Sequence, residues 1–243
     1  MSFRKILGSL RKADQDYDLI NTNDKIAVGI SGGKDSVLLL HALILYRRYV
    51  KKDYKIIAIS IDVGFDNDLS DIKQYFEELE IEFIIEKTKI KDILSKHLVK
   101  GRLDCSLCST LKKGALVKIA KEHGCNKIAL GHNSDDAIET LLLNQIYGGK
   151  IATFSPSQYL SNENITLIRP FVYVHENDIK ETVIKLSLPI VKSNCPVDGF
   201  TKRQAIKELL DSIYKTYPEA KKNFLHMLSN HENVLLWTKK DKD

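Results

Sequence analysis

The chain has 243 residues, of which 43% are hydrophobic and 28% charged, and its formal net charge is +5. These values are ordinary for a globular protein, and the chain is long enough to bury a sizeable core. No apolar run approaches the roughly 20 residues that cross a membrane. Residues 1–20 mix basic and acidic side chains and contain no apolar signal core. We therefore expect a cytoplasmic protein that has no membrane partner.

Basic side chains concentrate in residues 87–121. This segment contains ten Lys or Arg and two acidic residues, so it carries +8, which is more than the charge of the whole chain. A charged run is often only a solvated helical face, but this one surrounds two of the four cysteines. A basic surface beside reactive side chains suits a polyanion such as RNA. The segment is therefore predicted to contact RNA phosphates.

Strands and helices alternate along most of the chain. The spacing of apolar residues predicts a helix over 2–20, a strand over 25–30, a helix over 36–49, a strand over 55–62, a helix over 69–79, a strand over 82–85, a helix over 109–123, a strand over 127–130, a helix over 136–147 and a short strand near 167–168. This alternation predicts an α/β fold, a parallel sheet with helices on both faces. Such sheets bind ligands beyond the carboxyl ends of their strands.

After Thr201 the pattern changes to helices alone, which are expected over 204–214 and 220–237. We expect three parts, listed here: an N-terminal helix in 1–22, a main domain in 23–200, and a C-terminal helical extension in 201–243 that packs on the core. The polar segment 148–164 predicts a mobile loop. The last six residues, 238–243, are expected to be disordered.

Residues 31–36, Ser-Gly-Gly-Lys-Asp-Ser, follow the first expected strand and open a helix. Their glycines allow a tight turn close to a phosphate, and the helix N-terminus offers unpaired N–H groups. Lys34, Ser31 and Ser36 add further donors. An ordinary glycine turn is the alternative, but the context favours a phosphate loop. The spacing is neither Walker A nor GxGxxG, so a γ-phosphate NTPase and a dinucleotide oxidoreductase lose support.

Two cysteines, Cys105 and Cys108, stand just before an expected helix inside the basic segment. Both surroundings favour the thiolate over the thiol. Cys125 precedes a strand and is expected to be structural, which leaves Cys195 as the third candidate thiol. A closed zinc site usually needs four protein ligands, whereas three thiolates can hold a [4Fe–4S] cluster with one iron free. The residues therefore favour the cluster, and zinc stays the alternative.

The phosphate loop resembles the PP-loop of the N-type ATP pyrophosphatases, and Gly-His-Asn-Ser-Asp-Asp at 131–136 resembles the second motif of that family. The chain is also similar to the TtcA-type branch, the tRNA 2-thiocytidine synthetases. The stretches that carry this similarity are 105–114, 127–132, 141–150 and 168–170. The resemblance extends from about Leu10 to Trp237. It implies an adenine nucleotide alpha-hydrolase-like, Rossmann-like fold.

The resemblance implies an ATP-dependent tRNA sulfurtransferase. Such an enzyme adenylates a pyrimidine C2 oxygen, that of cytidine 32 in this branch, and replaces it with sulfur, releasing AMP and pyrophosphate. The implied cofactors are ATP, Mg²⁺ and a [4Fe–4S] cluster. The implied partners are tRNA, a sulfur donor of the cysteine desulfurase type, and a second copy of the chain in a homodimer.

The resemblance also assigns roles to individual residues. The implied catalytic residues are Lys34, Asp35, Cys105, Cys108 and Cys195. The implied cofactor-binding residues are Ser31, Gly32, Gly33, Lys34, Asp35, Ser36, Asp62, Gly131 and His132. The three cysteines would hold the cluster, and Asp135 and Asp136 would hold Mg²⁺. The alternative for the two aspartates is that they cap a helix.

The chain departs from the family pattern near Cys195. The family carries a second Cys-x-x-Cys motif there, whereas residues 192–198, Lys-Ser-Asn-Cys-Pro-Val-Asp, contain one cysteine. Other hypotheses therefore stay open: a lysidine-synthetase-like RNA ligase, a small-molecule sulfur transferase, or a zinc-stabilised RNA-binding protein. The ligase would need no cysteines, and the RNA-binding protein would need no phosphate loop. Sulfur could be delivered from the cluster's open iron or from a cysteine persulfide.

Overall fold

The computed structural model describes residues 3–99, 101–197, 201–230, 232 and 236–237. The chain forms two compact units. Unit 1 comprises Met1–Asp136 and Ser155–Thr201, and unit 2 comprises Ala137–Phe154 and Lys202–Asp243. The three-part division expected from the sequence stays a prediction. The expectation for 238–243 lies outside the described residues.

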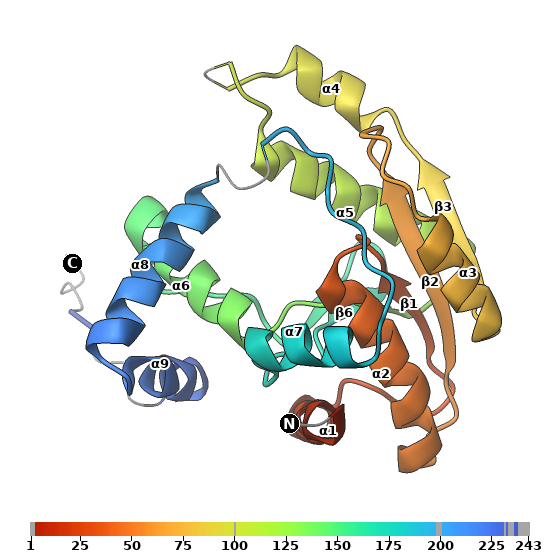
Figure 1. The fold of residues 1–243 in the computed structure, drawn as a ribbon, viewed down its shortest axis with the longest axis horizontal. Coiled ribbons are helices and arrows are strands. Elements are labelled where there is room, and N and C mark those ends of the chain that lie inside the picture. Colours follow the sequence, from red (N-terminus) through yellow and green to blue (C-terminus); the bar gives the residue numbers. More distant parts are fainter. Residues whose placement is uncertain (1–2, 100, 198–200, 231, 233–235, 238–243) are drawn as a thin grey trace, which may run out of the picture. The chain divides into compact units, whose positions relative to one another are not determined.

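Unit 1 is built on a six-stranded sheet with the order β3-β2-β1-β4-β6-β5 (Figure 1). The strands are β1 (Lys25–Gly29), β2 (Lys55–Asp62), β3 (Phe83–Lys87), β4 (Lys127–Ala129), β5 (Ser157–Leu160) and β6 (Ile165–Ile168). All neighbours pair in parallel except β5, which runs antiparallel to β6. The predicted α/β fold is confirmed. The chain order reverses between β1 and β4, and ligands of open α/β sheets bind at the carboxyl ends of the strands on either side of such a reversal.

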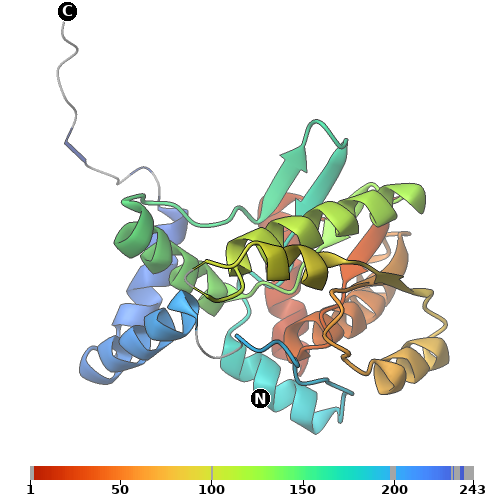
Figure 2. The same cartoon turned by 90° about the horizontal axis from the view of Figure 1, so that it is seen from above.

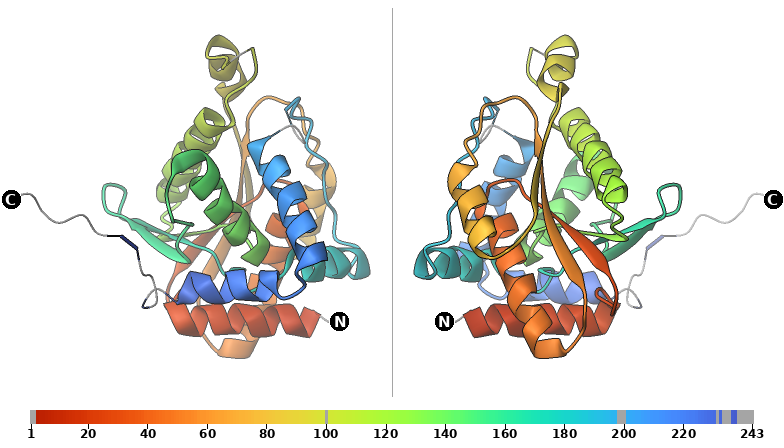
Figure 3. Two further views of the ribbon diagram at one scale, coloured as in Figure 1. Left: turned by 90° about the vertical axis from the view of Figure 1, so that its left-hand side faces the viewer. Right: turned by 90° about the vertical axis from the view of Figure 1, so that its right-hand side faces the viewer.

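Helices cover both faces of this sheet (Figure 3). On one face α2 packs against β1 and also contacts α1 and α7, while α3 packs against β3. On the other face α5 packs against β2 and β4 and contacts α4. The bounds are α1 (Phe3–Tyr17), α2 (Lys34–Val50), α3 (Ser70–Glu78), α4 (Ile90–Lys96), α5 (Cys105–Glu122) and α7 (Glu176–Lys185). Helix α6 (Ser134–Gly148) begins in unit 1.

The core of unit 1 follows from sequence patterns that suit a sheet covered on both faces. Residues 26–28 of β1 are buried in an unbroken row, as expected of a central parallel strand. Residues 37–40 of α2 are also buried in a row, because α2 lies between the sheet and the helices α1 and α7. Across the sheet, Val117 and Ala120 of α5 share a cluster with Ile128 of β4. These contacts fix α2 and α5 against the strands.

Three elements of unit 1 were not expected from the sequence: α4, α7 and β5. Helix α4 has seven residues, too few for a clear periodic pattern. Helix α7 buries Ile179, Thr182 and Val183 within an otherwise polar sequence. Strand β5 occupies part of the segment expected to be a loop. It is an edge strand held by backbone pairing with β6, and its Tyr159 is exposed.

Two helix ends also differ from the expectation. Helix α5 begins at Cys105 rather than at Ser109, because the Asp104 carboxylate accepts hydrogen bonds from the backbone N of Ser106 at 2.8 Å and of Leu107 at 3.3 Å. An N-cap of this kind fixes the start of a helix. The cysteine pair therefore lies in the first turn of α5, not before it. Helix α9 (Ala220–Ser229) ends eight residues before the expected Trp237.

Unit 2 contains the rest of α6 together with α8 (Lys202–Thr216) and α9. Its core joins α6 to the C-terminal helices through Ile138, Leu142, Ile206 and Leu210. The buried Glu139 carboxylate of α6 forms ion pairs with Arg203 at 3.5 Å and Lys207 at 3.4 Å on α8. In the part of the chain that the structure describes, no helix is both long and apolar enough to span a membrane.

Candidate active site

The phosphate loop connects β1 to α2 at the carboxyl edge of the sheet. Gly32 adopts φ +85°, a left-handed conformation that other residues rarely tolerate. A Cβ at this position would also lie 3.2 Å from the Leu69 side chain. Gly33 is the N-cap of α2 and provides no side chain to bond the first N–H groups of the helix. These N–H groups point out of the helix end, where an anion can accept their hydrogen bonds.

Two serines hold the loop in this shape. The Ser36 hydroxyl donates to the Gly33 carbonyl at 3.0 Å and accepts from the backbone N of Ser31 at 3.2 Å. The Ser31 hydroxyl accepts from the backbone N of Gly33 at 3.3 Å and lies 3.2 Å from the Ser36 hydroxyl. The predicted loop residues 31–36 thus form one turn at the start of α2. The serine hydroxyls also have a structural role that the sequence did not indicate.

Lys34 stands in the first turn of α2 with its ammonium group between two carboxylates. Its Nζ lies 2.9 Å from Asp35 Oδ2 and 3.0 Å from Glu176 Oε1, which belongs to the first turn of α7. Burial alone would lower the pKa of Lys34, but the charges and hydrogen bonds of Asp35 and Glu176 outweigh it and raise that pKa. Lys34 is therefore a fixed cation at the helix end. No motif in the sequence singles out Glu176, which lies 142 residues after Lys34.

The second motif lies directly against the loop. A Cβ on Gly131 would lie 2.9 Å from the backbone carbonyl carbon of Asp35, closer than real Cβ contacts allow. The Asn133 side-chain amide donates to Asp35 Oδ1 at 3.1 Å. His132, between these two residues, is half-buried. The two predicted motifs therefore meet at the reversal in strand order between β1 and β4.

Gly131→Ala is expected to destabilise the fold, because the added methyl group meets backbone atoms that cannot rotate away. We expect a loss of about 1–3 kcal/mol in the free energy of unfolding, the usual range for overpacking. Gly114→Ala is the matched control, since a Cβ there meets nothing within 4 Å. Urea unfolding of both variants measures the difference. Equal stability of the two variants would show that α2 and the second motif are not in tight contact.

The two aspartates predicted to bind magnesium take part in the start of α6. Asn133 Oδ1 accepts from the backbone N of Asp135 at 2.9 Å and of Asp136 at 3.2 Å, and Asp136 Oδ2 accepts from the backbone N of Asn133 at 2.9 Å. This reciprocal arrangement is a capping box. Asp135 Oδ2 accepts from the backbone N of Glu176 at 2.9 Å and so ties α6 to α7. The capping alternative thus describes these contacts, and the magnesium role stays a prediction.

Asp62 ends β2 at the same edge of the sheet. Its carboxylate accepts from the backbone N of Gly64 at 2.8 Å, and its carbonyl accepts from the backbone N of Thr88 at 3.0 Å. These bonds fix the two connections that follow β2 and β3. The nucleotide role predicted for Asp62 stays a prediction, although its position agrees with it.

The segment that carries Cys195 is pinned to the phosphate loop and to the loop after β2. The backbone N of Val191 donates to the Gly32 carbonyl at 2.8 Å. The backbone N of Asn194 donates to Asn67 Oδ1 at 2.9 Å. Four residues of extended chain span at most about 13–14 Å, so Cys195 lies within that distance of the Val191 backbone. The segment thus joins one candidate cysteine to the phosphate loop.

The other two candidate cysteines lie on α5, beside the same edge. Cys105 is exposed and Cys108 is half-buried. Cys108 packs against the cluster of Val63, Ile90 and Leu94, which joins α4 to the end of β2. The carboxyl ends of β2 and β3 therefore position the cysteine pair.

Burial and neighbouring charges raise the pKa of both cysteines on α5. Burial raises the pKa of Cys105, and the charges of Cys195 and Asp104 raise it further. Burial also raises the pKa of Cys108, partly offset by Lys112, with Cys195 and Cys105 raising it further. The expectation of lowered thiol pKa values is thus wrong for the free protein, because burial and mutual repulsion outweigh the helix end and the lysine. Repulsion among thiolates is what a bound metal centre relieves.

Cys125 differs from the other three cysteines. It is buried in the core under α5, where burial raises its pKa to about 11. The charges that affect it come from Lys25 and Glu82 rather than from another cysteine. Within the described residues, no three His, Cys, Asp or Glu side chains are arranged to hold a metal ion. Cys105, Cys108 and Cys195 supply the right donor type for a cluster, and they would have to draw closer together to bind one.

Comparisons with known proteins agree with this geometry. Residues 5–210 match the PP-loop domain family. A tRNA-cytidine(32) 2-sulfurtransferase from Citrifermentans bemidjiense is 40% identical over 239 residues, which cover 97% of this chain and 94% of that protein. Another from Geotalea daltonii is 42% identical over 234 residues, covering 94% of this chain and 92% of that protein. The chain belongs to this family of PP-loop proteins.

A solved structure extends the comparison of these PP-loop proteins to the fold. The U34-tRNA thiolase NcsA from Methanococcus maripaludis, with its [4Fe–4S] cluster, superimposes with a TM-score of 0.72 at 25% identity. The match covers 96% of this chain and 81% of that one. The PP-loop fold predicted from the sequence is therefore confirmed over nearly the whole chain.

Proposed function

We propose that this PP-loop protein is an ATP-dependent tRNA sulfurtransferase that converts cytidine 32 to 2-thiocytidine. The observation that carries the proposal is the Val191–Gly32 hydrogen bond of 2.8 Å, which ties the Cys195 segment to the phosphate loop. Activation by ATP and delivery of sulfur must occur at the same base, so the two sites have to be neighbours. The relatives supply the reaction, and this contact supports the required proximity of the two sites.

The first step needs a cation and hydrogen-bond donors at the phosphates of ATP. Attack of the C2 oxygen of cytidine on the α-phosphate forms an O-adenylate and releases pyrophosphate. Lys34 and the first N–H groups of α2 stabilise the negative charge that grows on the phosphates, without having to reorganise. Mg²⁺ at Asp135 and Asp136 would neutralise the departing pyrophosphate.

The second step replaces the activated oxygen with sulfur. A sulfur nucleophile attacks C2, and the C2–O bond breaks with AMP as the leaving group. A [4Fe–4S] cluster bound by Cys105, Cys108 and Cys195 would supply an open iron that carries the sulfur. These cysteines would hold that group beside the carboxyl edge of the sheet. A donor of the cysteine desulfurase type would renew the sulfur. A homodimer and a cytoplasmic location complete the proposal.

The proposal is tested with protein purified without oxygen. We expect about one cluster per chain by iron count, with no stoichiometric zinc, and ATP-dependent formation of 2-thiocytidine at position 32 of tRNA by mass spectrometry. Stoichiometric zinc without iron would favour the zinc-stabilised alternative. Pyrophosphate release without sulfur incorporation, but with an amine in the product, would favour the lysidine-type ligase.

Glu176→Gln is expected to lower the KM for ATP a few-fold with little change in kcat. The ATP phosphates must compete with two carboxylates for the Lys34 ammonium, and this variant removes one of those charges while keeping its shape. A partly exposed ion pair contributes up to about 1 kcal/mol, which sets the size of the effect. Steady-state kinetics at varied ATP measures it. A higher KM at unchanged kcat would mean that Glu176 assists ATP instead.

A further inference from the structure

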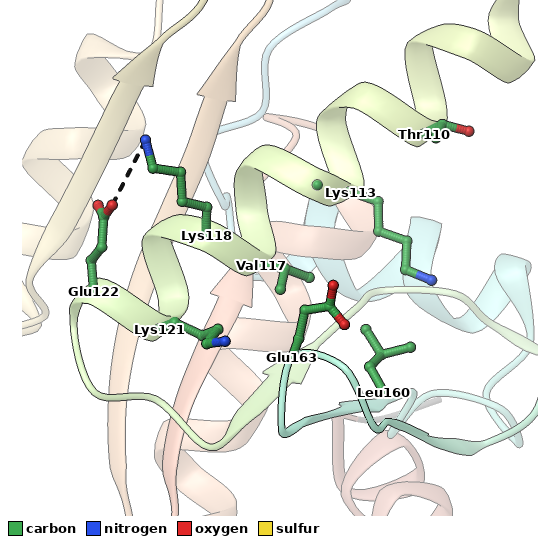
Figure 4. A pocket seen from close by; sticks show the side chains of 9 residues that line it. Thr110, Lys113, Val117, Lys118, Lys121, Glu122, Leu160 and Glu163 are labelled. Carbon is green, nitrogen blue, oxygen red and sulfur yellow. Dashed lines mark ion pairs between the residues drawn. The ribbon is translucent and has the colours of Figure 1, made fainter.

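Helix α5 and the β5–β6 hairpin can be followed in Figure 2, and a groove lined by residues of both lies outside the candidate active site (Figure 4). Its volume is about 590 Å³. It is lined by Thr110, Lys113, Gly114, Val117, Lys118, Lys121 and Glu122 of α5 and by Leu160 and Glu163 of the hairpin. The lining residues include neither Cys105 and Cys108 nor any residue of the phosphate loop. The groove is therefore separate from the reacting groups.

The charges in the groove are of two kinds. Lys113, Lys118 and Lys121 are exposed on α5. Lys118 pairs with Glu122 at 3.8 Å. Among the residues that the structure describes, neither Lys113 nor Lys121 forms an ion pair. Two cations of the wall are therefore available to an anionic partner.

Glu163 faces these lysines from the hairpin turn. It is half-buried, whereas its neighbours Asn162 and Asn164 are exposed, and Figure 4 shows its carboxylate and the Leu160 side chain pointing towards α5 at Val117. The turn is held by the bond from the backbone N of Glu163 to the Leu160 carbonyl at 3.2 Å. Within the described part of the chain Glu163 forms no ion pair. The groove thus offers an acceptor beside two cations, above an apolar floor.

We infer that this groove binds a ribonucleotide of the RNA substrate away from the nucleotide that reacts. A nucleotide within an RNA strand has a phosphate on each side, one for Lys113 and one for Lys121, an apolar base face for Val117 and Leu160, and a 2′-hydroxyl that donates to Glu163. A simple anion has no hydrogen-bond donor, so the Glu163 carboxylate would only repel it. DNA would lack the 2′-hydroxyl. The hydrogen bond from the 2′-hydroxyl to Glu163 therefore favours RNA over DNA, while the two lysines attract the phosphates of either.

The position of the groove on α5 fits a long substrate. Lys113 and Lys121 follow Cys105 by 8 and 16 residues, which correspond to about 12 and 24 Å along a helix axis. An RNA that presents one base to the cysteines extends further than this distance. The inference rests on the proposed function, because it takes tRNA as the substrate.

The test uses full-length tRNA and a DNA oligonucleotide of the same sequence as probes, with affinities measured at several salt concentrations. Lys113→Gln with Lys121→Gln is expected to weaken tRNA binding and to reduce the log–log salt slope by about 1.4–1.8, since each phosphate contact contributes about 0.7–0.9. The matched control is Lys55→Gln with Lys73→Gln, two exposed lysines on β2 and α3. An equal slope in the two double variants would overturn the inference.

A second variant fills the groove without changing its charge. A Cβ on Gly114 meets nothing within 4 Å, so Gly114→Leu places a side chain in the groove and strengthens the helix. We expect weaker tRNA binding with unchanged ATP affinity. Gly8→Leu in α1 is the control, because Gly8 is exposed and its Cβ also meets nothing within 4 Å. Equal tRNA affinity in the two leucine variants would contradict an occupied groove.

Glu163→Gln separates nucleotide binding from simple charge attraction. If Glu163 accepts a hydrogen bond from RNA, the ratio of the affinity for tRNA to the affinity for DNA is smaller in the variant than in the wild-type protein. If the groove attracts phosphate charge alone, the variant binds both probes more tightly by the same factor, and the inference is wrong. Thiolation by the wild-type protein is measured in parallel. If the wild-type protein thiolates tRNA but the groove variants bind tRNA as their controls do, the inference about the groove is wrong and the proposed function stands. If the wild-type protein does not thiolate tRNA, the proposed function is wrong.

Discussion

Lys34→Ala is expected to lower ATP-dependent pyrophosphate release by about 100- to 1,000-fold, the range for loss of one preorganised donor in an active site. Lys34 supplies the fixed cation at the start of α2, between Asp35 at 2.9 Å and Glu176 at 3.0 Å. Its loss leaves two carboxylates facing the phosphates of ATP, so repulsion adds to the missing attraction. Release of pyrophosphate in the presence of tRNA measures the effect.

The folded state should survive this change. A partly exposed ion pair contributes about 1 kcal/mol or less to stability, so thermal unfolding should shift by a few degrees. Lys73→Ala, which removes an exposed lysine paired with Glu77 at 3.8 Å on α3, is the control and should release pyrophosphate at the wild-type rate. Ser36→Ala tests the loop independently, since it removes the hydroxyl that bonds Gly33 and Ser31. Full release in both loop variants would rule out the phosphate-binding role.

Cys195→Ala is expected to abolish the visible absorption of the iron–sulfur cluster and the sulfur transfer, while ATP binding survives. The reason is ligand number: Cys105 and Cys108 alone leave half of a four-iron cluster without protein ligands. ATP binding should persist because the Val191 contact to the loop uses the backbone. Anaerobic absorption spectra, iron content and ATP titration measure the three properties.

Cys125→Ala is the matched control for this variant. Cys125 is buried in the core under α5, and its ionisation is not affected by the other cysteines. The change removes one buried sulfur, so it should cost some stability but leave the spectrum and the activity intact. Full thiolation by Cys195→Ala, or loss of the cluster in Cys125→Ala, would show that the ligand set is different.

Much of the fold could be predicted because its strands are apolar runs between turn residues. The bounds of β2 agree with the prediction at both ends. The helix α2 was found from its leucines, and its start was placed two residues late. The elements that were missed lack such signals. Helix α7 owes its place to contacts with α2 and α1, and β5 to backbone pairing, and neither contact leaves a pattern in the local sequence.

The candidate site was predictable where one motif carries several functional groups. The loop at 31–36 and the motif at 131–136 meet as expected. Glu176 was missed because an acidic residue in the first turn of a helix is commonplace, and its pairing with Lys34 depends on the folded chain. The pKa of the cysteine pair was predicted in the wrong direction for a similar reason. The sequence shows the nearby lysines but neither the burial nor the approach of Cys195.

The hydrogen bond between Val191 and Gly32 has a thermodynamic consequence. Segment 191–195 is bonded to the phosphate loop at one end and carries Cys195 at the other, so ATP and a metal centre held by the cysteines would both act on it. If ATP changes the affinity of the chain for its metal centre by some factor, then loading the metal centre must change the affinity for ATP by the same factor. Titrating ATP into metal-free and metal-loaded protein therefore reports how strongly the two halves of the reaction are linked, without any turnover.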